Sequence, residues 1–218
     1  FQQNGSALTG TFLTPSGDYR FLEGIVSGKQ LQLSCFDGSH AYYFTATING
    51  NEISDGKFFS SASPVEPWSA TKNNAAALPD TTPVTQLKPG ESKLDFSFKD
   101  VSGKTVSIND ARFKNKVVVI QIMGSWCPNC MDESQFLSSF YNEYKSKGVE
   151  VLAIAYEYST DFNRSKASIQ KFINRFGIQY PVLIPPVTVS DEQRTEKTLP
   201  QLISIRSFPT TIFLTKSG

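Results

Sequence analysis

The sequence predicts two domains: a small antiparallel β domain, followed by an α/β domain with a central mixed sheet flanked by helices. Three observations predict this arrangement. Short β-prone runs separated by turn signals fill the first 62 residues, a proline-rich stretch follows, and strands alternate with helices after residue 90. Such alternation is typical of a sheet that is covered by helices.

Composition and charge exclude several classes of function. The chain has 218 residues, enough for one large domain or two small ones. The formal net charge is +1, which gives no electrostatic reason to expect a nucleic-acid partner or a strongly acidic substrate. No apolar run approaches the roughly 20 residues that a membrane span needs. The chain opens at Phe1 without an initiator methionine or a charged leader, so we expect a processed or truncated start, with a targeting segment or lipid anchor upstream.

The antiparallel β domain is predicted over residues 1–62, as a meander or a small barrel. Its start lies close to the chain terminus, so part of this module is expected upstream. Turn signals rich in Gly, Asn, Asp and Ser lie between the runs, at 15–18, 27–29, 37–39 and 49–51. The expected strands are 11–13, 19–25, 30–35, 41–48 and 52–59.

A proline-rich linker is predicted over residues 63–90. Prolines at this density remove backbone donors from ladders and helices, which favours an extended or wrapping segment. Trp68 is the exception, because a tryptophan in such a segment usually packs onto a flanking domain. The prolines are Pro64, Pro67, Pro79, Pro83 and Pro89.

Strands and helices alternate in the α/β domain, which is predicted over residues 91–218. Residues 117–123 and 149–155 are apolar enough for strands that are buried on both faces. Helices are expected at 130–147 and 166–176, and Gly148 and Gly177 are placed to end them. This order predicts parallel pairing of the two buried strands through a right-handed crossover. The other expected strands are 94–98, 106–108, 182–184 and 211–214.

Cys127 and Cys130 flank Pro128 and Asn129 where the predicted helix begins. Unpaired N–H groups and the helix dipole favour a thiolate at this position, and the thiolate is the form that attacks disulfides. We therefore expect Cys127 to be exposed, with a lowered pKa, and Cys130 to be shielded one turn inside. Pro128 is tolerated in the first turn, where its missing N–H is not needed.

Two structural readings compete with a redox pair. The pair could be a structural disulfide, or half of a zinc site. A zinc site needs about four ligands, and the other candidates, Cys35 and the single histidine His40, lie in the other half of the chain. Three cysteines fit a redox pair better than a disulfide scaffold. We expect no metal and no cofactor, and a small buried apolar role for Cys35.

The second half of the chain resembles the thioredoxin-like superfamily. More narrowly, it is similar to the TlpA-type thiol–disulfide oxidoreductases of the bacterial envelope, a group linked with the AhpC/TSA domain. The resemblance covers 94–218, whereas the first half only loosely resembles β-rich modules fused to such domains in Bacteroidetes-type envelope proteins. The motifs are 95–98, Gly103-Lys104, 116–120, Trp126-Cys127-Pro128-Asn129-Cys130, Glu133 and Phe208-Pro209-Thr210-Thr211.

The resemblance implies a role for each motif residue. Cys127 would be the attacking cysteine and Cys130 the resolving one. Pro209 would be a cis-proline facing the disulfide, and Phe208 would offer its backbone to an extended substrate segment. Glu133 would accept the proton of the resolving thiol.

The residues beside the cysteines form a second group of candidates. Trp126 would shield the site and limit access to it, and Pro128 would shape the start of the helix. Tyr156 and Tyr158 lie at the end of a predicted strand, near the edge of the sheet where the active site is expected. They would either pack in the core or contact the substrate. Thioredoxin-like domains add a strand and a helix after the segment that matches 211–214, so we expect this domain to lack its last elements and to leave an edge there.

The leading hypothesis is an enzyme, a thiol–disulfide oxidoreductase that reduces or exchanges disulfides of envelope proteins. The resemblance implies a periplasmic or cell-envelope location, protein thiols and disulfides as partners, and an upstream electron donor. A thiol peroxidase is an alternative, but the Pro-x-x-x-Thr-x-x-Cys frame of peroxidatic cysteines is absent, since residues 120–127 read Ile-Gln-Ile-Met-Gly-Ser-Trp-Cys. A binding module that uses the fold as a scaffold is another alternative.

Overall fold

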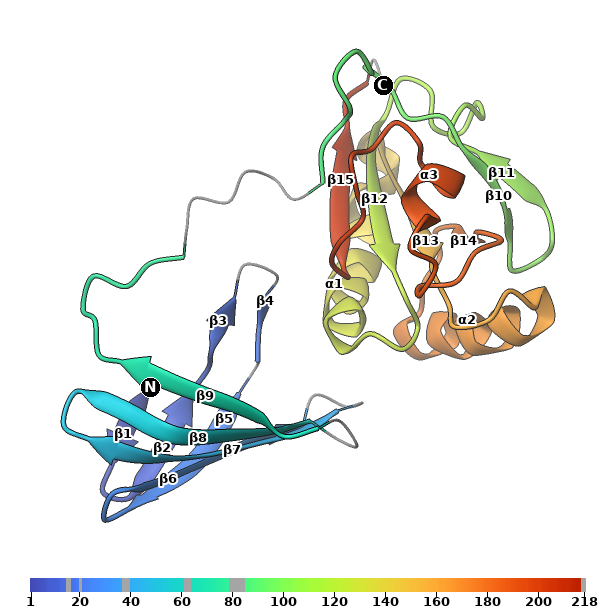
Figure 1. The fold of residues 1–218 in the computed structure, drawn as a ribbon. Coiled ribbons are helices and arrows are strands. Elements are labelled where there is room, and N and C mark those ends of the chain that lie inside the picture. The colour runs from blue at the N-terminus through green and yellow to red at the C-terminus, as the bar shows by residue number, and fades with distance from the viewer. Residues whose placement is uncertain (15–16, 20, 37–39, 61–63, 79–84, 217–218) are drawn as a thin grey trace. The chain divides into compact units, whose positions relative to one another are not determined.

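The computed structural model describes residues 1–14, 17–19, 21–36, 40–60, 64–78 and 85–216. The chain divides into two compact units, Phe1–Thr82 and Pro83–Gly218, which are described separately (Figure 1). The predicted turn at 37–39, residues 15–16 of another predicted turn, residues 61–62 of the predicted β domain, and residues 63 and 79–84 of the predicted linker lie outside the described residues. None of the described helices has both the length and the apolar character that a membrane crossing requires.

The first unit is an antiparallel sheet of seven strands with the order β1-β2-β5-β6-β7-β8-β9 (Figure 1). Two of its hairpins close through two-residue turns, Gly28-Lys29 and Gly50-Asn51, in which each glycine has a positive φ of +60° or +63°. The strands are β1 (Gln2–Asn4), β2 (Ala7–Gly10), β5 (Leu22–Ser27), β6 (Gln30–Phe36), β7 (Ala41–Asn49), β8 (Glu52–Ser60) and β9 (Glu66–Thr71), and β3 (Leu13–Thr14) pairs with β4 (Gly17–Asp18) outside this sheet.

Two strand predictions for this unit were wrong. The first strand was expected at 11–13, but the sheet already begins at Gln2 and β2 ends at Gly10. Strand β9 lies inside the predicted linker, where its proline density argued against a strand. Pro67 fits there because β9 is an edge strand paired only with β8, so the missing N–H interrupts no second ladder.

The core of the first unit is aromatic as well as aliphatic. Trp68 packs here as expected, with its ring centroid 5.8 Å from Phe12 and 6.1 Å from Phe44. Phe44 also stacks on Phe58, with a centroid separation of 4.4 Å. The buried apolar residues around these rings are Leu8, Leu22, Leu31, Leu33, Phe44 and Ala46.

The second unit has the thioredoxin-like fold that the resemblance implied, a six-stranded mixed sheet with the order β11-β10-β14-β13-β12-β15 (Figure 1). Strand β12 pairs in parallel with β13 and antiparallel with β15. The strands are β10 (Ser97–Asp100), β11 (Thr105–Ser107), β12 (Val117–Met123), β13 (Val149–Ala155), β14 (Val182–Ile184) and β15 (Thr210–Leu214).

Two helices connect the parallel strands, α1 (Pro128–Tyr144) from β12 to β13 and α2 (Phe162–Phe176) from β13 to β14. Gly148 follows a short 3-10 segment after α1, and Gly177 ends α2, as the sequence predicted, and both glycines have the left-handed conformation. The short helix α3 (Arg194–Thr198) was not predicted, because it has a single turn and no capping side chain.

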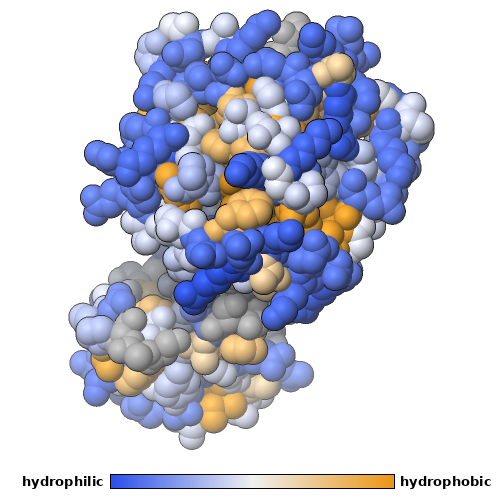
Figure 2. Space-filling view, turned by 90° about the vertical axis from the view of Figure 1, so that its right-hand side faces the viewer, coloured by the Kyte–Doolittle hydropathy of each residue, from blue (hydrophilic) through white to orange (hydrophobic). Residues whose placement is uncertain are grey.

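Strand β12 separates two apolar cores. Its even-numbered residues Val118, Ile120 and Ile122 pack into the core that also holds residues of the loops around α3. Its odd-numbered residues Val119 and Met123 face the core with α1 and α2, which includes both cysteines. Charged and polar side chains cover much of the molecular face drawn in Figure 2, and apolar atoms appear there in separate patches.

A buried carboxylate ties the start of β13 to the segment before β12. Glu150 is 5% exposed and accepts hydrogen bonds from Arg112 Nε and Lys116 Nζ, each 2.9 Å long. Burial alone would raise the pKa of Glu150. The hydrogen bonds from Lys116 and Arg112, together with their charges, outweigh burial and leave the pKa below its usual value of 4.5.

We expect Glu150→Gln to lower the free energy of unfolding by about 1–2 kcal/mol at pH 7, discounted because the two cations are partly exposed. A carboxyl whose pKa is lowered by folding stabilises the fold above its unfolded pKa. That stability is lost as the pH falls from 4.5 through the lowered value. Urea unfolding at pH 7 and pH 3 should therefore show the wild-type advantage shrinking in acid, and an advantage that is constant with pH would contradict this role.

Candidate active site

The cysteine pair sits where β12 ends and α1 begins. Cys127 is the N-cap residue of α1, as predicted, and its N–H donates to the carbonyl of Gly124 over 3.1 Å. Cys127 and Cys130 form a disulfide, and Cys127 Sγ accepts the N–H of Cys130 over 3.2 Å. Pro128 opens the helix in its first turn, where no donor is lost. A Cβ on Gly124 would overlap the Trp126 ring, so the loop requires glycine there.

The expected exposure of Cys127 was wrong for this oxidised form. Cys127 is only 3% exposed, and Cys130, expected to be shielded, is fully buried. The half-buried side chains of Trp126, Met131 and Phe208 pack against the apolar cluster that contains both cysteines. Phe208 lies about 80 residues from Cys127 in the sequence, so sequence position alone did not reveal that it joins this cluster.

Phe208 and Pro209 lie next to the cysteine loop. The Phe208–Pro209 bond is cis, as predicted, and Thr210 opens β15 opposite Ile122, near the end of β12. The Phe208 ring lies 5.5 Å from Trp126, between centroids, and 5.9 Å from Tyr156. The pairing of β15 with β12 therefore brings together motifs that are far apart in the sequence.

Glu133 belongs to a buried polar network below the disulfide. One of its carboxylate oxygens accepts from Gln121 Nε2 over 2.8 Å, and the other accepts from the hydroxyl of Thr211. The same amide nitrogen of Gln121 lies 3.4 Å from the Cys130 carbonyl, and Ser134 donates to the Gln121 oxygen. Glu133 is thus anchored beside the turn that carries Cys130.

Two tyrosines near the site stay protonated around neutral pH. Burial raises the pKa of Tyr156 to about 12, and its hydroxyl pairs with Thr198 over 2.6 Å. Burial also raises the pKa of Tyr180, and the negative charge of Glu133 adds to that shift. Tyr158 differs from Tyr156, since it is 65% exposed and its ring lies 5.2 Å from that of Trp126.

Glu157 is a site residue that sequence reasoning missed. It follows β13, is 6% exposed, and accepts the N–H of Ser125 over 2.8 Å and the hydroxyl of Ser125 over 2.7 Å. Next to it, Trp126 Nε1 donates to the Tyr156 carbonyl over 2.9 Å. Two signals were available in the sequence. Glu157 is a charged residue just after a buried strand, and Gln121 is a polar residue within an apolar strand.

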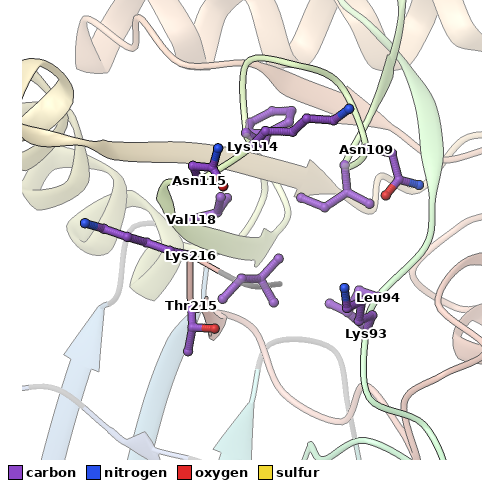
Figure 3. Close-up of a pocket in the computed structure, with 11 residues that line it drawn as sticks. Lys93, Leu94, Asn109, Lys114, Asn115, Val118, Thr215 and Lys216 are labelled. Atoms are coloured by element: carbon purple, nitrogen blue, oxygen red, sulfur yellow. The ribbon is translucent and has the colours of Figure 1, made fainter.

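The described part of the chain contains no group of three or more His, Cys, Asp or Glu side chains that could hold a metal ion. A pocket of about 460 Å³ lies elsewhere, and the labelled lysine and asparagine side chains are among the residues that line it (Figure 3). It is lined by Val118 at the start of β12, whereas the cysteines follow the far end of this strand. A seven-residue strand is about 20 Å long, so the pocket is not part of the cysteine site.

The fold and the cysteine loop define a thioredoxin-like oxidoreductase class. The sequence model of the Redoxin family matches residues 80–188, which is half of the chain, and the chain belongs to this family.

The chain is also similar to individual curated proteins and solved structures. The thiol-disulfide oxidoreductase ResA of Halalkalibacterium halodurans is 27% identical over 132 residues, 60% of this chain and 65% of that protein. ResA of Geobacillus kaustophilus is 28% identical over 137 residues, which are 63% of this chain and 69% of that protein. The chain spans only 53% of ResA from Bacillus thuringiensis, strain Al Hakam. Among solved structures, the thioredoxin domain of a Bacteroides vulgatus thiol-disulfide oxidoreductase has a TM-score of 0.48 and 22% identity over 61% of this chain and 85% of that one.

Proposed function

We propose that this protein is a thiol–disulfide oxidoreductase whose reactive group is the Cys127–Cys130 pair. The observation that carries the proposal is the disulfide at the N-cap of α1, where unpaired N–H groups favour a thiolate once the pair is reduced. We further propose that it acts on protein disulfides in the periplasm or cell envelope of a bacterium, as the family resemblance implies. The substrates and the upstream electron donor are part of this proposal.

The reduced pair would act in two displacement steps. The Cys127 thiolate attacks one sulfur of a substrate disulfide, forms a mixed disulfide and releases the first substrate thiolate. Cys130 then loses its proton and attacks Cys127 Sγ, which releases the second substrate thiolate and leaves the disulfide seen here. Two electrons pass from the pair to the substrate, and a dithiol donor must later restore the reduced pair.

Glu133 is placed to take the proton in the second step. Its carboxylate is fixed by Gln121 and Thr211, and Gln121 also lies against the carbonyl of Cys130. A carboxylate acts as a proton acceptor only within direct or one-water reach of the proton. The anchored position near Cys130 supports this role better than a solvated helix-turn carboxylate would.

The substrate would approach past an aromatic rim. Trp126 and Phe208 pack edge to face beside the cysteine cluster, and the exposed Tyr158 extends the rim outward. Phe208 precedes the cis-proline Pro209 and would present its backbone to an extended peptide, and Pro128 would shape the opposite wall. Because Cys127 is only 3% exposed in the oxidised form, we expect Trp126 or Phe208 to shift when substrate binds the reduced form.

The burial of Cys127 is also the observation that favours a second candidate, a binding module that uses the fold as a scaffold. The two candidates differ in thiol reactivity. An active oxidoreductase should react with iodoacetamide at Cys127 as soon as the pair is reduced. A Cys127 thiol that stays unreactive in the folded, reduced protein would favour the binding module.

The central test traps the mixed disulfide. We expect Cys130→Ser, incubated with oxidised glutathione, to accumulate one glutathione adduct on Cys127, because the resolving thiol is absent. Wild type should pass through this adduct without accumulating it. Intact-mass and peptide spectrometry would locate the adduct, and the same variant could then capture envelope proteins.

The matched control is the double variant Cys127→Ser/Cys130→Ser, which keeps Cys35 as its only cysteine. It should take up no adduct at the site. If the single variant is modified only at Cys35, or not at all, the assignment of Cys127 as the attacking residue is refuted.

A further inference from the structure

Glu157 is a buried acid that the proposed exchange steps do not use. Its two carboxylate oxygens accept hydrogen bonds from the N–H and the hydroxyl of Ser125. No lysine or arginine within the described ranges lies within 4 Å of it to form an ion pair. Hydrogen bonds from neutral donors alone leave most of the electric field of a carboxylate uncancelled.

The charge of Glu157 is bonded to the residue two positions before Cys127. Consecutive Cα atoms are about 3.8 Å apart, so Ser125, which contacts Glu157, has its Cα within about 7.6 Å of the Cys127 Cα. Glu157 and Cys127 are 6% and 3% exposed, and charges interact more strongly where water is excluded. A fixed negative charge at this range disfavours a second negative charge on Cys127.

The other charged groups around the pair are anchored elsewhere. Glu133 on α1 is bound by Gln121 and Thr211, and Asp132 is exposed. The guanidinium of Arg194 on α3 lies 5.9 Å from the Phe208 ring and donates to backbone carbonyls. Glu157 is therefore the acid that is bonded directly to the loop carrying Cys127.

We infer that Glu157 is a positioning residue that makes the cysteine pair a stronger reductant, by fixing the loop through Ser125 and by destabilising the Cys127 thiolate. The inference rests on the proposed function and deepens it, because it assigns a preferred direction of electron flow. Destabilising the thiolate destabilises the reduced form of the pair, and a less stable dithiol donates its electrons more readily.

The test is the equilibrium of the pair with glutathione. Glu157→Gln keeps an oxygen that accepts from Ser125 but removes the charge, so we expect the equilibrium constant to shift about three- to tenfold toward the reduced pair, with tenfold equal to about 30 mV. The thiolate absorbance at 240 nm should titrate at lower pH in this variant than in wild type. An unchanged equilibrium constant would overturn the inference.

Three further variants separate the charge from the contact. Ser125→Ala keeps the charge and loses the hydroxyl donor, so its equilibrium constant should stay within about twofold of wild type while thermal stability falls. Glu143→Gln removes an exposed carboxylate near the far end of α1 and should change nothing. Glu157→Asp keeps the charge and should stay near wild type, which leaves a usable variant if Glu157→Gln does not fold. A shift as large in Ser125→Ala or Glu157→Asp as in Glu157→Gln would refute the role of the charge.

This test separates two kinds of failure. If the wild-type pair exchanges with glutathione and Glu157→Gln behaves like wild type, the inference about Glu157 fails and the oxidoreductase function stands. If the wild-type pair does not exchange at all, the proposed function fails first and the role of Glu157 fails with it.

Discussion

Replacing Cys127 with serine is expected to lower the rate of disulfide reduction at least about a thousandfold, because a hydroxyl does not ionise near neutral pH and attacks sulfur poorly. Serine is nearly the same size as cysteine, so it should fit the buried position of Cys127. Apart from the loss of the disulfide, the fold should therefore be unchanged. The measurement is the reduction of insulin by dithiothreitol, followed as turbidity, with circular dichroism to verify folding.

Cys35→Ser is the matched control for that substitution. Cys35 lies on β6 of the first unit and takes no part in the Cys127–Cys130 disulfide, so its loss should leave insulin reduction within about twofold of wild type. Reduction that persists in Cys127→Ser, or that disappears in Cys35→Ser, would exclude the proposed mechanism.

The reactive pair was predictable from the sequence because its chemistry is local. The spacing of Cys127 and Cys130, Pro128 between them and the preceding apolar run all lie within a short segment, and the structure confirms the helix start that they predict. The distant Pro209 entered only through the family resemblance. Its place follows from the pairing of β15 with β12, which no local pattern encodes.

The support around the pair was not predictable in the same way. Gln121 was counted as part of an apolar strand, yet its amide joins Glu133 to Cys130. Glu157 follows another strand and becomes a site residue only because β13 lies beside β12. Phe208 also joins the cluster that contains Cys127 only through tertiary packing. Each of these contacts is tertiary, so residue type and spacing carried little information about it.

The β half shows the limits of local signals for the fold. Glycine turns located the hairpins around Gly28 and Gly50 correctly. The edge strands β1 and β9 were missed, because β1 is short and polar and β9 contains a proline. An edge strand pairs with a neighbouring strand on one side only, so it tolerates polar residues and proline.

The largest stability effect is expected from Ile154→Ala. Ile154 is fully buried near the end of β13, and both neighbouring strands hold it in register, opposite Ile122 and Leu183. A site that is fixed on both sides collapses little around a lost side chain, so we expect a loss of about 3–4 kcal/mol, near the middle of the range for such truncations. With a typical urea dependence for a small domain, the midpoint should fall by more than about 1 M.

Each unit contains one tryptophan, which makes this prediction measurable in the full chain. Trp68 reports on the first unit and Trp126 on the second, so fluorescence in a Trp68→Phe background follows the unit that contains Ile154. Ile203→Ala is the matched control, because the same side chain is 46% exposed there and its loss should cost less than about 1 kcal/mol. Since β13 leads directly to Tyr156 and Glu157, a cavity at Ile154 should also loosen the support of the cysteine loop. Equal midpoint shifts for the two variants would mean that the central strands do not form the rigid core on which this site depends.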